Sequence, residues 1–191
     1  MQLQHVATRM GGEPARRAGE VAHKCRGTLA EMNQLPTAWK DALARVARSR
    51  SSRIHMPTAL LVALDMVEAG EAPGGSIEFL KFESRFKALM KRVRPNAANT
   101  AWAPFYHLST KSGLWDLYLG DEKADFSEVS GSPKSRSRVL KRADRAMLSG
   151  ELVSGLSNPG TIQTIRDSVY ELLRKDDDSD SETLIRLHST V

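Results

Sequence analysis

The sequence has little cysteine and no long apolar run. Its 191 residues include a single cysteine, Cys25, which excludes an intramolecular disulfide framework and a zinc site built from several cysteines. No stretch approaches the roughly 20 apolar residues that a membrane-spanning helix needs, and the N-terminus contains no apolar signal core. We therefore expect a cytoplasmic protein with a reduced thiol and no membrane partner.

The common catalytic motifs are also missing from the sequence. The five histidines are far apart, so neither an HNH nor an HExxH metal pocket can be assembled from them, and the glycines form no Walker A or GxGxxG pattern. Asp121-Glu122-Lys123 matches the D-x-K tripeptide with which some nucleases hold a metal ion and water, but its partner carboxylate, Asp116, is too near to come from a separate strand. A turn is the alternative interpretation. We predict a protein that is not an enzyme and needs no metal or cofactor.

Positive charge, by contrast, is abundant and unevenly distributed. The chain has 28 Lys+Arg and 23 Asp+Glu, a net charge of +5, but five of the acids lie within residues 176–182, and without them the rest would carry +10. The cations are concentrated in three runs: residues 40–53, 81–94 and 134–145. Such runs favour a polyanionic partner because each phosphate contact releases counterions. A solvated surface is the plain alternative for any one of them.

Hydrophobic periodicity predicts an α+β fold: a mainly helical single domain with a small β-hairpin. Residues 57–69, which Pro57 opens, are apolar nearly all round a helix, so this helix is expected at the centre of the core. Two aromatic runs, 104–108 and 114–119, flank a short glycine-containing loop, which is typical of a β-hairpin. Trp115 is expected to be part of the core.

Composition divides the chain into three parts. Residues 1–35 lack firm periodicity and are expected to be a flexible N-terminal segment, whereas residues 176–191 are expected to be a frayed, acidic C-terminal tail. The folded domain is expected between them, over residues 36–175. Within it, the polar and Ser-rich residues 120–138 are interpreted as an exposed linker, and helical spacing resumes around 141–149.

The order of motifs in the middle of the chain resembles a known family. The motifs are HMPTALLVALDMVEAGEAPGGSIEF, then FESRFKALMKRVRP, then APFYHLSTKSGLWDL. This order is similar to that of the sulfur-binding domain of McrA-like HNH type IV restriction endonucleases, which recognises phosphorothioate DNA. The resemblance covers residues 37–173 and is strongest over 55–119. It implies a stand-alone DNA-binding module of a restriction or defence system, without the HNH nuclease half.

The resemblance also implies a set of site residues. In the family, a small apolar cup receives the sulfur of the modified phosphate, and basic side chains hold the backbone. Here His55 takes the place of the histidine before the central helix, and the wall of the cup is formed by Pro104, Phe105, Tyr106 and His107. Met56 and Ala103 depart from the family, which usually has Lys or Arg and Tyr at these places. Both departures weaken the case for sulfur recognition more than the case for DNA binding.

Further phosphate contacts are predicted from the basic residues themselves. Arg50 and Arg53 precede the start of the central helix, and His55 stands at that start, where unpaired N–H groups and the helix dipole attract anions. Lys111, in the loop of the expected hairpin, is the third predicted cationic contact. Arg50, Arg53, His55 and Lys111 are therefore expected to contact the DNA backbone.

Three hypotheses follow for the function. The first is a module that binds double-stranded DNA and reads its phosphorothioate modification, with a separate nuclease as partner. The second is a protein-interaction subunit of a restriction or defence complex whose DNA surface has decayed. The third is a nuclease that uses the D-x-K tripeptide. Salt dependence separates the first two, because binding to DNA weakens steeply as ionic strength rises.

Overall fold

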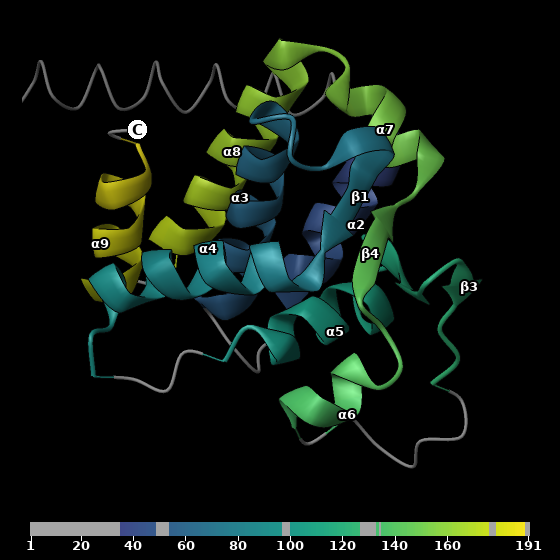
Figure 1. Cartoon of the computed structure of the whole chain (residues 1–191). Coiled ribbons are helices and arrows are strands. Elements are labelled where there is room, and N and C mark those ends of the chain that lie inside the picture. Colours follow the sequence, from purple (N-terminus) through teal and green to yellow (C-terminus); the bar gives the residue numbers. More distant parts are fainter. Residues whose placement is uncertain are drawn as a thin grey trace, which may run out of the picture.

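The computed structural model describes residues 35–48, 54–96, 100–126, 133, 135–175 and 179–189. Figure 1 shows its elements, which are α2 (Thr37–Arg48), α3 (His55–Glu68), a 3-10 turn (Pro73–Gly75), β1 (Ser76–Glu78), α4 (Phe79–Val93), α5 (Trp102–Thr110), β2 (Trp115–Leu119), β3 (Glu122–Lys123), α6 (Arg136–Leu140), β4 (Arg145–Leu148), α7 (Gly150–Leu156), α8 (Pro159–Arg174) and α9 (Ser179–His188). The fold is α+β and mainly helical, as the periodicity predicts.

The central helix is α3, as expected from its apolar sequence. It begins at His55 and is buried almost continuously from Met56 to Leu64. Helices α4, α5 and α8 pack around it and cover its apolar residues. Gly70 follows its end with φ of 70°, a conformation that glycine adopts without the steric cost other residues meet.

The strands form one small antiparallel sheet in the order β1-β4-β2-β3. Ala146 of β4 pairs with Ile77 of β1 on one side and Leu117 of β2 on the other. These three side chains are buried, and the sheet thus faces the helices with its apolar side, because residues in register share a face.

The predicted hairpin is wrong in its first half. Residues 104–108 belong to helix α5, in which the Phe105 N–H donates to the Ala101 carbonyl. Pro104 fits the first turn of a helix as well as the start of a strand, because its missing N–H would have no helical partner there. The second half is confirmed as strand β2, whose hairpin partner is β3 through a tight turn at Gly120, where φ is 58°.

Two other segments also differ from the prediction. The helical spacing at 141–149 is overturned, because residues 145–148 form β4, the strand between β1 and β2. A central strand gains ladder hydrogen bonds on both edges, and these outweigh the weak local preference of a short segment. The interpretation of 120–138 as a linker is also wrong where this segment is described, since it includes β3 and the start of α6.

The C-terminal segment is folded where the structure describes it. Residues 179–188 form helix α9 rather than a frayed tail, and α9 packs against α8 and α4. Leu184 is fully buried in that contact. The segment is helical because its apolar residues pack on α4 and α8, of which α4 lies far away in the sequence.

An aromatic cluster forms the interior beneath α4, α5 and β2. Its members are Phe79, Phe82, Phe86, Phe105 and Trp115, with neighbouring ring centroids 5.0 to 6.0 Å apart. Trp115 is 2% exposed and donates from Nε1 to the Phe105 carbonyl at 2.9 Å, so its predicted place in the core is confirmed. No helix in the described part of the chain is long and apolar enough to cross a membrane.

Candidate nucleic-acid interface

The outer side of α4 presents a row of cations. Lys87 and Lys91 follow Glu83 at four-residue spacing, so the three side chains lie along one side of the helix. The Lys87 Nζ is 2.9 Å from a Glu83 carboxylate oxygen. The inner side of the same helix buries Phe82 and Phe86, and this anchoring fixes the direction of the outer row.

Helix α6 is joined to this row by an arginine. The guanidinium of Arg136 donates to both carboxylate oxygens of Glu83, at 2.8 to 3.0 Å. Hydrogen bonds to Arg136 hold the pKa of the Glu83 carboxyl below its ordinary value, against the opposing effect of burial. This two-pronged ion pair links α6 to α4, while α6 itself packs on α5 and buries Val139.

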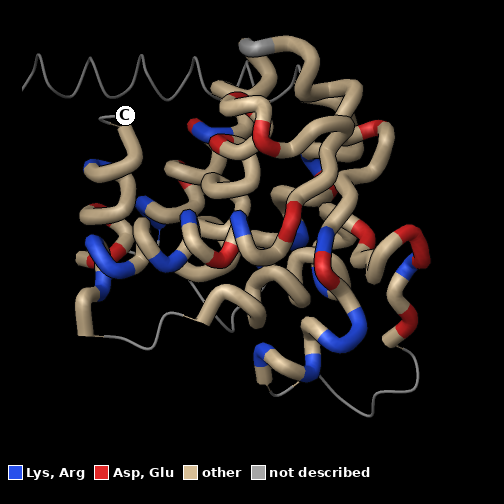
Figure 2. The backbone as a smooth tube through the Cα atoms, viewed as in Figure 1, with Lys and Arg blue, Asp and Glu red and all other residues tan. Residues whose placement is uncertain are grey.

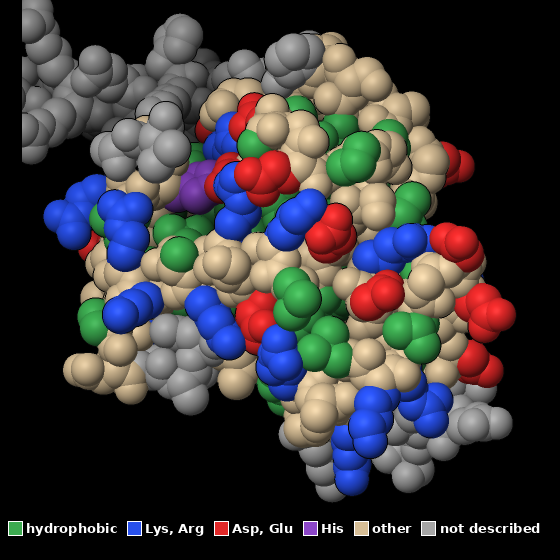
Figure 3. Space-filling view, viewed as in Figure 1, with side chains coloured by type: hydrophobic (Ala, Val, Ile, Leu, Met, Phe, Trp, Pro, Cys, Tyr) green, Lys and Arg blue, Asp and Glu red, His purple; other side chains and the backbone are tan. Residues whose placement is uncertain are grey.

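The cations of these two helices make up what we call the basic face: Lys87, Lys91 and Arg92 of α4, and Arg136, Arg138 and Lys141 of α6 or its C-terminal end. Arg92 directly follows Lys91, so it extends this face around α4 and is not part of the row formed by Lys87 and Lys91. Six cations against the one carboxylate of Glu83 leave a net formal charge of +5. Four of them are exposed and form no ion pair with another described residue: Lys91, Arg92, Arg138 and Lys141. Figures 2 and 3 show Lys and Arg along α4 and α6 on one side of the molecule.

The first basic run is placed elsewhere. Arg45 and Arg48 are exposed on α2, which packs against α7 and α8 and lies behind α3 and β4 in Figure 1. The described part of this run, residues 40–48, therefore does not extend the basic face. Arg50 and Arg53, two of the predicted phosphate contacts, lie outside the described residues.

His55 is the first residue of α3, whereas the sequence predicts it just before a helix that Pro57 opens, and its ring packs inward. It is half-buried and stacks on Phe86, with ring centroids 6.2 Å apart. Burial lowers the pKa of the imidazole, and the nearby Arg94 lowers this pKa further. The ring is therefore neutral at neutral pH, and it makes no side-chain cap for the helix.

The residues expected to wall a sulfur-binding cup are mostly buried. Phe105 is fully buried in the aromatic cluster, and Tyr106, at 7% exposed, packs edge-on against Phe126. Pro104 is buried as well. Met56 is only 1% exposed, so it points into the core and an arginine there would bury its charge. These side chains support the fold and do not line an open surface in this structure.

His107 and Lys111 lie on the far half of α5. His107 is partly exposed, but its Nδ1 is buried and has no hydrogen-bond partner among the described residues. Burial lowers the pKa of its imidazole, and Lys111 adds to that effect. Lys111 is exposed at the C-terminal end of the helix, where its N–H donates to the His107 carbonyl. The structure brings these two residues together at the C-terminal half of α5.

The D-x-K tripeptide, residues 121–123, lies at the turn and in the second strand of the β2–β3 hairpin. Lys123 pairs with Asp116 across the two strands at 2.9 Å, and Asp121 pairs with Arg145 of β4 at 2.9 Å. The two carboxylates are thus each engaged by a cation. Among the described residues, no group of three His, Cys, Asp or Glu side chains comes together as a set of metal ligands.

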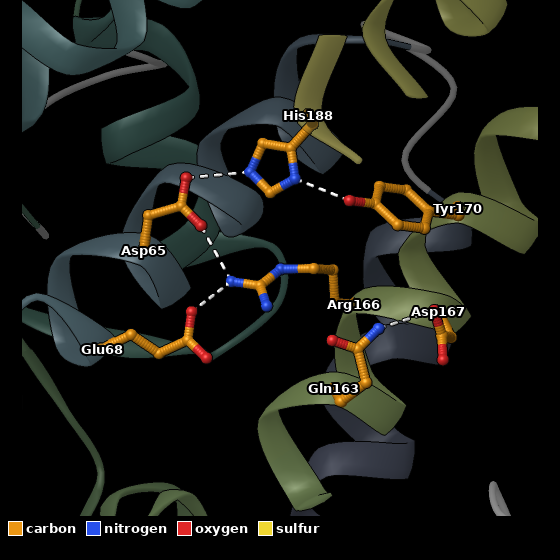
Figure 4. Close-up of polar contacts among 7 residues, drawn as sticks. All are labelled: Asp65, Glu68, Gln163, Arg166, Asp167, Tyr170 and His188. Carbon is orange, nitrogen blue, oxygen red and sulfur yellow. Dashed lines mark hydrogen bonds and ion pairs between the residues drawn. The ribbon is translucent and has the colours of Figure 1, made fainter. Parts of the chain in front are cut away.

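A polar cluster that the sequence analysis missed joins α3, α8 and α9 (Figure 4). His188 of α9 contacts Asp65 through Nε2 at 2.8 Å and the Tyr170 hydroxyl through Nδ1 at 2.6 Å. Arg166 donates to Asp65 at 2.9 Å and to Glu68 at 2.6 Å. The chain of contacts resembles a catalytic relay in outline. Burial raises the pKa of Tyr170. The contacts join α9 to α3 and α8, and α8 to α3, so the cluster ties the three helices together.

Sequence alone offers little signal for this cluster. Asp65 and His188 are 123 positions apart, and His188 lies in a short polar segment with no local sign of a partner. The one available hint is Asp65 itself, a charge within the apolar sequence of α3. Such a charge needs a partner when other helices cover it.

Comparison of the chain with protein-family models, with curated proteins and with solved structures found no match. The resemblance to sulfur-binding domains therefore stays a prediction, and the function is argued from the chain's own surface.

Proposed function

We propose that this protein is a DNA-binding module that holds the phosphate backbone of double-stranded DNA with its basic face. The observation that carries the proposal is the group of exposed cations on α4 and α6, four of which have no carboxylate partner among the described residues. Cations left unpaired on a folded surface repel one another, and a polyanion relieves that repulsion while releasing its counterions.

The dimensions of the basic face suit a duplex. From Glu83 to Lys91, α4 advances eight residues, or about 12 Å at 1.5 Å per residue. Double-stranded DNA presents roughly one negative charge per 1.7 Å of its axis, so several phosphates lie within reach of such a row. The Glu83–Arg136 pair links the two helices, and the packing of α6 on α5 fixes its position, so the face is formed before DNA arrives.

The resemblance adds a finer hypothesis, which is a preference for phosphorothioate DNA in a restriction or defence system. The burial of Phe105 and Met56 favours backbone contacts over a sulfur-receiving cup built from these residues. The proposal of DNA binding therefore stands without the preference for sulfur, and the same titration tests both.

The experiment is a fluorescence-polarisation titration of matched plain and phosphorothioate duplexes at several salt concentrations. The double variants Lys91→Ala/Arg92→Ala and Arg138→Ala/Lys141→Ala should each weaken binding to every duplex and reduce the salt slope by about two units. The matched control, Arg45→Ala/Arg48→Ala, removes the same charge from α2 and should leave the affinity nearly unchanged.

Each alternative predicts a different result. Equal weakening by all three double variants would show that net charge, rather than the basic face, attracts DNA. Affinity that is insensitive to salt would favour the protein-interaction subunit instead. Tighter binding of the phosphorothioate duplex would support the resemblance, and a loss confined to an Arg50→Ala/Arg53→Ala variant would place the contacts before α3.

A further inference from the structure

The row of cations on α4 does not end at Lys91. Arg94 is the C-cap of α4, three residues beyond Lys91, and its N–H still donates to the Met90 carbonyl. Its backbone thus completes the last helical turn, on the side of the helix that carries Lys87 and Lys91. Its side chain is 40% exposed. Arg94 is therefore the C-terminal continuation of the basic face.

An acidic side chain from α9 forms an ion pair with this arginine. The Asp180 carboxylate lies 2.7 Å from the Arg94 Nε, which is the length of a charge-assisted hydrogen bond. The two residues belong to segments 86 positions apart in the sequence, and α9 brings them together by packing across α4 and α8. A carboxylate held this way presents to Arg94 the same negatively charged oxygen that a phosphate would offer.

We infer that α9 is an autoinhibitory element of the basic face, in which Asp180 stands in for a DNA phosphate at Arg94. The inference rests on the proposed function. The helix is placed by contacts away from the basic face: Leu184 is fully buried, and His188 is tied to Asp65 and Tyr170. The ion pair itself is partly exposed on both sides, at 40% and 25%, and pairs of this kind are weak enough for a polyanion to displace.

The chain offers a matched control for this contact. Glu182 lies in the same first turn of α9, is exposed, and forms no ion pair with another described residue. Replacing Glu182 by Gln removes the same charge from the same helix as Asp180→Asn. A difference between the two variants therefore reports the contact with Arg94 and not the change in net charge.

The experiment measures the affinity of plain duplex DNA for Asp180→Asn, Glu182→Gln and Asp180→Glu by fluorescence polarisation across a salt series. Asp180→Asn should tighten binding by about threefold to tenfold and steepen the salt slope by about one unit, because one more phosphate contact forms. Glu182→Gln should tighten binding by less than about twofold, because salt screens the long-range effect of a single charge. Asp180→Glu keeps the carboxylate and should bind like the wild type.

A double-mutant cycle gives the sharpest outcome. In an Arg94→Gln background, Asp180→Asn should have no more effect than Glu182→Gln, because the arginine that it releases is gone. Equal tightening by Asp180→Asn and Glu182→Gln, or no tightening by either, would overturn the inference. The proposed function would still stand if the double variant Lys91→Ala/Arg92→Ala weakened binding to the duplex. If neither the wild type nor any variant binds the duplex, the proposed function fails and the inference fails with it. Circular dichroism of each variant checks that α9 stays helical.

Discussion

The two ends of α3 are buried against different kinds of surface. Near its start lies the aromatic cluster of α4, α5 and β2, in which the rings of Phe82, Phe105 and Trp115 are buried against one another. The indole N–H of Trp115 is the polar group of these three side chains. Toward the end of α3 lies the polar cluster of Asp65, Arg166 and His188. The aromatic side depends on apolar area and close packing, whereas the polar side depends on pairs of charges that water and salt can partly replace.

The difference indicates which parts of the molecule can move. Elements packed through aromatic rings lose much apolar contact if they separate, so α4, α5 and β2 form the permanent body of the domain. Helix α9 is attached by the buried Leu184 and by polar contacts at both of its ends. Local stability is therefore expected to be lower at α9 than at the aromatic cluster.

The largest effect is expected in the aromatic cluster. Trp115→Ala should lower the free energy of unfolding by about 3–5 kcal/mol, because a large cavity forms and the Phe105 carbonyl loses its indole donor. Thermal or denaturant unfolding measures the change. The control is Leu80→Ala on the outer side of α4, where the side chain is 63% exposed and the change should be small. Equal effects of the two variants would contradict the position of Trp115 in the core.

A smaller effect is expected at the polar cluster. Asp65→Ala should lower the free energy of unfolding by about 1–3 kcal/mol, because the buried polar groups of Arg166 and His188 lose a charged hydrogen-bond partner. Hydrogen exchange should rise mainly in α9, which His188 ties to α3. Glu68→Ala removes only the more exposed partner of Arg166 and should have less effect. Uniform exchange across the molecule would show that α9 and the aromatic cluster unfold together.

The ion pair between α4 and α6 should give a modest, pH-dependent effect. Because the pKa of Glu83 is lowered in the folded state, its contribution to stability is present above its ordinary value of 4.5 and is lost as the pH falls through the lowered pKa. Glu83→Gln should therefore lower the Tm by a few degrees at neutral pH and converge with the wild type in acid. Glu78→Gln, which breaks only an exposed pair with Lys81, is the control. A constant difference in Tm at every pH would argue against this pair.

The smallest effect concerns His55. Burial and Arg94 lower the pKa of its imidazole below 6.5 in the folded state, so the unfolded chain binds a proton more readily and stability falls as the pH drops below that value. His55→Gln should remove part of this loss between neutral and mildly acidic pH, as measured by urea titrations at each pH. Identical pH profiles for His55→Gln and the wild type would show that the ring is solvated.

Much of the fold was predictable because helices such as α3 carry their periodicity locally. The inward position of Trp115 followed in the same way from an aromatic run with strand character. Strand β4 was not predictable, since its four residues resemble helix until β1 and β2 pair with them on both edges. The prediction for residues 104–108 was wrong for the opposite reason. Their aromatic composition suits a strand, but they form a helix that packs on α3 and accepts a hydrogen bond from Trp115.

The candidate site, too, was predictable only where it depends on neighbouring residues in the sequence. By itself, the sequence determined the α+β class, the central helix and the presence of basic runs, because composition and helical spacing are properties of neighbouring residues. Only the tertiary structure decided that α4 and α6 share one face through Glu83 and Arg136, and that α9 returns to place Asp180 on Arg94. These two contacts join side chains that are separated by 53 and by 86 positions in the sequence. They leave no local pattern, because they exist only once the helices have packed.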